Sequence, residues 1–167
     1  MHNELTENDI KKMQEEIHAL NNEVIPDLLV QLKAARDLGD LSENDEYHSI
    51  KRELGKRRGR VRYLQNMIDT ATVISVGNHQ NAIDLFDRVT IYDEDDEEER
   101  DITIATTVRN DPLNGIISNA APLGKALLGK KVGDRVEIRV KPDYSYFVVV
   151  RKIEKGHDDS ALPINSY

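Results

Sequence analysis

The sequence predicts an α+β protein made of two parts, because the spacing of its apolar residues changes near residue 71. Before that point apolar residues recur every three or four positions, which is typical of one face of a helix. After it, short runs rich in Val, Ile and Thr alternate with polar residues, as β-strands do. A polar segment at 39–46 divides the helical part in two. We therefore expect an antiparallel helical hairpin at 1–75 and a globular domain at 81–156.

The first helix is predicted to begin after Thr6 and to end near Leu38. Thr6 and Asp9 form a suitable N-cap pair, and Gly39 is a typical helix-ending residue. Pro26 removes one backbone hydrogen bond within this helix, so we expect a kink between residues 22 and 26. The apolar face is made by Ile10, Met13, Ile17, Leu20, Val24, Leu28, Leu32, Ala35 and Leu38.

The second helix is predicted to begin between Ser42 and Asp45 and to end near Thr70. Acids in its first turn complement the helix dipole. Gly55 and Gly59 lie inside it and each costs about 1 kcal/mol relative to Ala. We interpret them as places where the partner helix approaches closely. Two such helices joined by a short turn fold back on each other, which puts the turn at the far end of a long hairpin.

The rest of the chain is predicted to form antiparallel strands with one short helix on a face of the sheet. The helix is expected at 122–130, with Pro at its start and Gly at its end. Residues 75–86 are expected to be a linker, and 157–167 a mobile tail. The predicted strands lie at 72–76, 88–92, 102–104, 115–117, 135–140 and 146–150.

Composition excludes several classes of protein. The 167 residues are 38% hydrophobic and 32% charged and contain no cysteine, so disulfides and thiolate metal sites are excluded. The histidines are scattered without zinc-ligand spacing. No apolar run approaches the roughly 20 residues that span a bilayer, and the polar N-terminus is unlike a signal peptide. We expect a cytoplasmic protein without membrane contact.

Charge is concentrated in three segments, although the net charge is only −8. The turn at 39–46 holds four carboxylates, which repel one another and contribute little to folding; a metal ion or a cationic partner would explain them. Residues 51–62 contain seven basic side chains and the single acid Glu53. A local basic stripe on an acidic protein fits contact with nucleic acid inside a larger complex. The eight acids at 93–101 are interpreted as a solvated hairpin loop.

Two motifs resemble those of the bacterial GreA/GreB transcript cleavage factors, and the resemblance covers nearly the whole chain. One is Gly-Asp-Leu-Ser-Glu-Asn at 39–44, followed by Glu46 and Tyr47. The other is Pro-Leu-Gly-Lys-Ala-Leu-Leu-Gly-Lys at 122–130, followed by Val-Gly-Asp at 132–134. The basic segment at 57–64 looks more like that of GreB than of GreA. The resemblance implies an N-terminal coiled coil and a C-terminal domain with an FKBP-like fold.

The resemblance also implies a function. Such factors dock on RNA polymerase by the C-terminal domain and pass the coiled coil down the secondary channel to the polymerase active site. There the polymerase cuts backtracked RNA, whose 3′ end is extruded. By position, Asp40 and Glu43 are the pair that would help to hold a Mg²⁺ ion shared with the polymerase. The chain would act as a monomer, bind no cofactor alone, and stimulate the polymerase's cleavage rather than be an enzyme itself.

The chemistry of the pair agrees with that role. Mg²⁺ prefers oxygen ligands and is often bound by only one or two protein carboxylates. A metal already coordinated by polymerase acids could be completed by two more. RNA contact is expected from four arginines, and docking on the polymerase from four apolar residues. The former are Arg57, Arg58, Arg60 and Arg62; the latter are Ala121, Pro122, Leu123 and Leu127.

Departures from the family pattern leave alternatives open. Asp45 stands where the family usually has Ala and adds a third charge beside the pair. Ala120 and Ala121 replace polar residues that the family uses at the polymerase rim, so a docking hydroxyl is lost. A Gre-like inhibitor, which blocks the same channel without stimulating cleavage, is therefore the main alternative. A structural adaptor that uses the hairpin as a spacer is a second. For the charged segments themselves, a solvated turn and a solvated helix face are the simpler readings.

Overall fold

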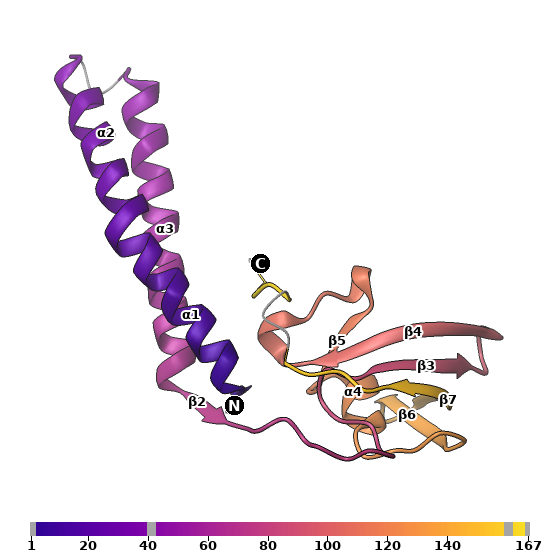
Figure 1. Ribbon diagram of the computed structural model, residues 1–167. Helices are drawn as coiled ribbons and strands as arrows, with labels where there is room; N and C mark the ends of the chain where they lie inside the picture. The colour runs from indigo at the N-terminus through magenta and orange to yellow at the C-terminus, as the bar shows by residue number, and fades with distance from the viewer. Residues whose placement is uncertain (1–2, 40–42, 159–161, 166–167) are drawn as a thin grey trace. The chain divides into compact units, whose positions relative to one another are not determined.

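The computed structural model describes residues 3–39, 43–158 and 162–165, and it divides into two compact units (Figure 1). One unit is the helical hairpin, Ile10–Ala71. The other consists of Met1–Asp9 together with Thr72–Tyr167. The start of the chain thus belongs with the C-terminal unit, whereas the predicted hairpin ran from residue 1.

The first arm of the hairpin contains the expected irregularity. Thr6 and Asp9 cap α1 reciprocally: the Asp9 N–H donates to Thr6 Oγ1 at 3.2 Å, and the Thr6 N–H donates to Asp9 Oδ2 at 2.9 Å. The predicted kink is present as a π-helical turn next to Pro26, where the Ile25 N–H bonds the Leu20 carbonyl five residues back. Proline has no N–H with which to continue the regular ladder. The arm consists of α1 (Glu7–Ala19), the π-helix Leu20–Val24 and α2 (Ile25–Asp37).

The second arm is α3 (Asp45–Asp69), which runs alongside α2 in Figure 1. The predicted helical stripes form the buried or half-buried face of the hairpin, except that Leu38 at the end of the first arm is 76% exposed and does not belong to that face. The interpretation of the two glycines is wrong, however. A Cβ built on Gly55 or Gly59 meets no atom within 4 Å, so neither glycine is needed for helix packing. The buried apolar residues are Met13, Leu20, Ala35, Tyr47, Leu54, Leu64 and Met67.

The C-terminal unit is built on a five-stranded sheet in the order β5-β4-β3-β7-β6. The predicted α+β class is confirmed, with one correction: β4 and β5 pair in parallel, and the other neighbours are antiparallel. One short helix, α4, follows β5. The bounds are β3 (Arg88–Asp93), β4 (Glu98–Ala105), β5 (Ile116–Ser118), α4 (Pro122–Leu127), β6 (Arg135–Lys141) and β7 (Tyr144–Glu154).

The segment predicted as a linker contributes to the core at its C-terminal end. Ile83, Leu85 and Phe86 are buried among the sheet residues. The Ile83 N–H donates to the Lys130 carbonyl at 2.9 Å, and the Phe86 N–H donates to the Ile104 carbonyl at 2.6 Å. The three apolar residues within four positions were the available signal. Upstream, β2 (Ala71–Val73) pairs with β1 (Asn3–Leu5) in a separate two-stranded sheet.

Charged side chains fix this segment further. Lys155 Nζ donates to Asp84 Oδ2 at 3.1 Å and to Asp87 Oδ2 at 2.5 Å. Burial acts to raise the pKa of Asp84, but the hydrogen bonds from His79 and Lys155 outweigh it and hold that pKa below its ordinary value. The pKa of Lys155 is raised: burial opposes the shift, and the bonds to Asp87 and Asp84 exceed it. The globular core of the C-terminal unit therefore begins near residue 83, inside the segment predicted to be a linker.

The described part of the predicted mobile tail contacts the C-terminal unit. Asp158 pairs with Arg109 at 2.9 Å, and the Asn165 N–H donates to the Val108 carbonyl at 2.7 Å. Leu162 packs against the hydrophobic core. In the ranges 3–39, 43–158 and 162–165, no helix has the length and apolar character needed to cross a bilayer.

Candidate functional site

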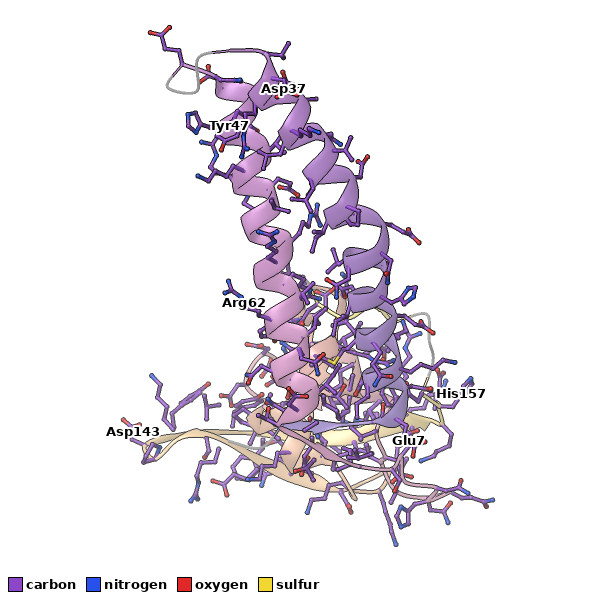
Figure 2. All side chains as sticks on the ribbon, turned by 90° about the vertical axis from the view of Figure 1, so that its left-hand side faces the viewer. Glu7, Asp37, Tyr47, Arg62, Asp143 and His157 are labelled. Carbon is purple, nitrogen blue, oxygen red and sulfur yellow. The ribbon has the colours of Figure 1, made fainter. Side chains whose placement is uncertain are left out.

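The acidic turn lies where α2 ends and α3 begins. Gly39 has a φ of +128°, a conformation that favours glycine, and it directly follows the C-cap of α2. Asp40, the first residue of the predicted pair, lies outside the described residues. Glu43, the second, is exposed. Figure 2 shows Asp37 and Tyr47 at this same end of the hairpin. The described carboxylates of this end therefore face solvent at the end of a two-helix support.

Asn44 holds the two helix ends together. Its Oδ1 accepts the Tyr47 N–H at 2.9 Å, which caps α3. Its Nδ2 donates at 2.7 Å to the Ala35 carbonyl in the last turn of α2, which also accepts the Leu38 N–H at 3.3 Å. One side chain thus satisfies a donor of one helix and an acceptor of the other. Because Asn44 follows Glu43 directly, it fixes the backbone from which that carboxylate projects.

Packing below the turn supports the same geometry. Tyr47 and Ala35 are buried, which agrees with the prediction that Tyr47 packs within the hairpin. Asp45 and Glu46 are exposed in the first turn of α3, where a carboxylate complements the helix dipole. Among the described residues, no group of three His, Asp or Glu side chains could hold a metal ion.

Removing the Asn44 side chain should loosen the tip. Asn44→Ala is expected to lower the free energy of unfolding of the hairpin by about 1–2 kcal/mol, because an N-cap and a bond to the other helix are both lost. Asn44→Asp keeps the acceptor for Tyr47 but cannot donate to Ala35, so it should fall between Ala and the parent. Urea unfolding followed by circular dichroism measures both.

Asn22→Ala is the matched control for this change. Asn22 Nδ2 donates to the His18 carbonyl within one arm at 2.9 Å, at an exposed position. Its loss leaves the contact between the two arms intact. Equal destabilisation by Asn22→Ala and Asn44→Ala would show that Asn44 does not join the helix ends.

The four arginines of the predicted basic stripe differ in whether they form ion pairs. Arg60 binds Glu16 with two hydrogen bonds, of 2.7 and 3.1 Å, across the hairpin, and its side chain is only 13% exposed. Arg57 pairs with Glu53 one turn away. Arg58 and Arg62 are exposed, and no described carboxylate lies within ion-pair distance of either. Of the four arginines, Arg60 is the one whose charge is compensated at a largely buried position, whereas the exposed pair of Arg57 with Glu53 is weak.

The predicted docking patch is smaller than expected. Leu127 is fully buried in the core of the C-terminal unit, so it cannot contact a partner and is removed from the patch. Leu127 is buried because α4 packs on the sheet through Leu127 and Gly124. The approach is close: a Cβ added to Gly124 would lie 2.2 Å from the Ser118 carbonyl oxygen. Pro122 is exposed, and Ala121 and Leu123 are partly exposed. These three residues remain as candidates.

Sequence reasoning missed two features of this region. The role of Asn44 as the N-cap of α3 is one of them, although an Asn directly before two acids and a helical pattern is an N-cap signal. A cavity on the hairpin, beside Gly55, was also missed. The glycines were the available signal, but they were assigned to helix packing.

The described architecture is a two-helix hairpin with exposed carboxylates at its end, followed by a small mixed-sheet unit, and comparison with known families places the chain among the transcription elongation factors. Two family models match the chain: "Transcription elongation factor, N-terminal" over residues 3–73 and "Transcription elongation factor, GreA/GreB, C-term" over residues 78–155. The chain belongs to the GreA/GreB family of transcription elongation factors.

Two relatives with more than 35% identity agree with this assignment. The chain is 38% identical to the transcription elongation factor GreA of Oenococcus oeni over 153 residues, which cover 91% of this chain and 94% of the relative. It is 39% identical to GreA of Bacillus licheniformis over 150 residues, or 89% of this chain and 94% of that one. Among solved structures it is similar to GreA factor homolog 1 of Thermus thermophilus, with 20% identity, 93% and 100% coverage and a TM-score of 0.44.

Proposed function

We propose that this chain binds bacterial RNA polymerase as a monomer in the cytoplasm, enters its secondary channel with the hairpin, and stimulates the polymerase's own cleavage of backtracked RNA. The observation that carries the proposal is the exposed Glu43 at the end of the hairpin, held by Asn44 and preceded by Asp40 in the tip motif. The chain would be a factor that acts on the polymerase rather than a nuclease. A transcript cleavage assay on a stalled complex of the cognate polymerase tests this.

The tip residues fit a shared Mg²⁺ ion. Glu43 is exposed and has no ion-pair partner among the described residues, so its oxygens are available to a hard cation. Asp40 and Glu43 would be the two ligands from this chain, and the polymerase would supply the others. When bound in such a two-metal site, the ion stabilises charge on the attacking or the leaving oxygen. This chain's contribution is to present the carboxylates on a rigid support.

The extruded RNA would meet the hairpin along α3. Arg58 lies 15 residues from Glu43 and Arg62 lies 19 residues from it, which is roughly 22 and 28 Å along a helix. Only an RNA extruded by several nucleotides could reach that far. Phosphate contacts at these arginines would release counterions, so their contribution should fall as salt is raised.

Asp45 favours the alternative of a Gre-like inhibitor. It adds an exposed carboxylate beside the pair, at the first position of α3. Such a tip could occupy the channel and block nucleotide entry without productive cleavage. The same assay separates the two functions when it is read with and without added nucleotides. An activator shortens the RNA of a backtracked complex, whereas an inhibitor only slows its extension.

Docking on the polymerase is proposed to use the exposed apolar surface at the start of α4. Pro122→Glu should weaken polymerase binding at least about tenfold, because a few buried anchors carry most of the energy of an interface. A Glu at the first helical position is favourable for the helix dipole, so α4 should remain folded. Affinity for the cognate polymerase, measured by biolayer interferometry, checks this.

Val140→Glu is the matched control, since it also introduces one Glu at an exposed apolar residue of the same unit. It should bind like the parent. Ala121→Ser, which restores the family residue, should bind as well as the parent or slightly better. If Pro122→Glu also binds normally, docking does not use α4.

A further inference from the structure

The hairpin has a cavity of about 430 Å³ on one flank, away from the acidic tip. Small-molecule sites commonly have volumes of roughly 300–1,000 Å³. Its walls come from the π-helix, from the start of α2 and from α3. The lining residues are Asn21, Ile25, Gly55, Arg58, Val61 and Arg62. No carboxylate lines it, although the chain as a whole is acidic.

Two irregular features of the hairpin form this cavity. The π-helix places Asn21 at its edge, and π-helical turns within α-helices are rare and often occur at functional sites. Gly55 opens the opposite wall. It lies inside a helix, costs about 1 kcal/mol there relative to Ala, and has open space where its Cβ would be. Without a Cβ at this position, a group outside the hairpin can approach the backbone of α3 closely.

Basic side chains beside the cavity form a row along α3 that runs toward the acidic tip. Lys51, Gly55, Arg58 and Arg62 follow one another at spacings of four, three and four residues, which places them on one stripe of α3. Figure 2 shows Arg62 extending outward from α3. Arg57 and Arg60 lie off this stripe and are paired with Glu53 and Glu16. The stripe therefore places two arginines at the cavity, Arg58 and Arg62, neither of which has an ion-pair partner among the described residues, and continues to Lys51 on the side nearer the tip.

We infer that this cavity seats one base of single-stranded RNA, with the flanking phosphates on Arg58 and Arg62. Ile25 and Val61 supply apolar surface for the ring, and the Asn21 amide can pair with a base edge. Arginine planes also stack on bases, and unstacked bases are the usual targets of proteins that bind single-stranded RNA. The inference rests on the proposed function, because it names the place on the hairpin where extruded RNA would be held.

Binding of RNA to the full chain without polymerase tests the inference. Two probes carry equal phosphate charge: a uridine hexanucleotide, and a hexamer of the same backbone without bases. The uridine probe is expected to bind at least about 5-fold more tightly, because only this probe can remove a base from water against the apolar surface of Ile25 and Val61. In NMR titrations it should shift the backbone amide of Gly55 and the side-chain amide of Asn21. Equal affinity for the two probes would overturn the base site and leave only a charge effect.

Matched variants locate the site. Gly55→Phe fills the gap and should reduce the affinity for the uridine probe to that of the abasic one. Ser49→Phe puts the same ring at an exposed position of α3 outside the cavity and should leave both affinities unchanged. Arg58→Gln should weaken both probes more than Arg57→Gln, which removes the same charge from a paired residue. A loss with Ser49→Phe equal to that with Gly55→Phe would contradict the assignment. Circular dichroism confirms that each variant remains helical.

These results are distinguishable from failure of the proposed function. If the uridine probe binds at Gly55 but the chain stimulates no cleavage, the site stands and the proposed function falls. If cleavage is stimulated but the two probes bind equally, only the base site is lost.

Discussion

Asp40→Ala and Glu43→Ala are each expected to reduce stimulated RNA cleavage by about 100- to 1,000-fold, while polymerase affinity stays close to that of the parent. The loss of one group that stabilises charge at a reacting centre typically has this size. Affinity should be retained because Glu43 is exposed at the end of the hairpin, in a different unit from the proposed docking residues. Cleavage of a defined backtracked complex, with binding measured separately, gives both quantities.

Asp37→Ala is the control for this prediction. Asp37 is an exposed carboxylate at the last position of α2, at the same end of the hairpin, but it lies outside the tip motif (Figure 2). The Asp37→Ala variant should stimulate RNA cleavage as strongly as the parent does. Raised Mg²⁺ should partly restore the Asp40 and Glu43 variants, because a missing ligand weakens capture of the ion. If the Asp40→Ala variant stimulates cleavage at the parental rate, the proposed role of the tip carboxylates is wrong. If Asp37→Ala lowers the cleavage rate as much as Asp40→Ala does, the effect is a general one of negative charge at this end of the hairpin.

The helical hairpin could be predicted from sequence because its determinants are local. Apolar spacing identified both buried faces, Pro26 located the π-helical turn, and Gly39 marked the end of the first arm. The Thr6 and Asp9 cap was also visible, since both partners lie within three residues. Most strands were found for the same reason. The parallel pairing of β4 with β5 was not, because pairing partners are set by the packing of distant segments.

The availability of a charged side chain could not be predicted, because it depends on partners far away in sequence. Seven basic residues in one segment suggested a single RNA-binding stripe. Arg60, however, pairs with Glu16, which is 44 positions away, and its charge is already compensated. Leu127 was assigned to a docking surface from its motif alone, although α4 packs it into the core. A motif identifies residue types; burial decides which of them a partner can reach.

Arg109 is the buried charge that sequence reasoning missed entirely. Its side chain is fully buried, its Nε donates to Asp9 Oδ1 at 2.6 Å, and its Nη2 lies 2.9 Å from Asp158 Oδ1. The Phe86 ring centre lies 5.1 Å from the guanidinium carbon. Thr6 Oγ1 donates to the other oxygen of Asp158 at 2.6 Å. Asp9, near the N-terminus, and Asp158, near the C-terminus, thus both bind the guanidinium group of Arg109 inside the C-terminal unit.

Arg109→Leu is therefore expected to lower the free energy of unfolding of the C-terminal unit by about 3–5 kcal/mol, because the buried Asp9 and the largely buried Asp158 are left without a counter-charge. Urea unfolding measures this without screening the charges. Arg88→Leu, which removes an exposed arginine paired with Asp101, is the control and should change stability little. Adding Asp9→Asn and Asp158→Asn to Arg109→Leu should recover part of the loss, since the uncompensated charges are removed. If Arg109→Leu is no less stable than Arg88→Leu, or if the added Asn substitutions destabilise it further, the buried cluster does not stabilise this unit through its charges.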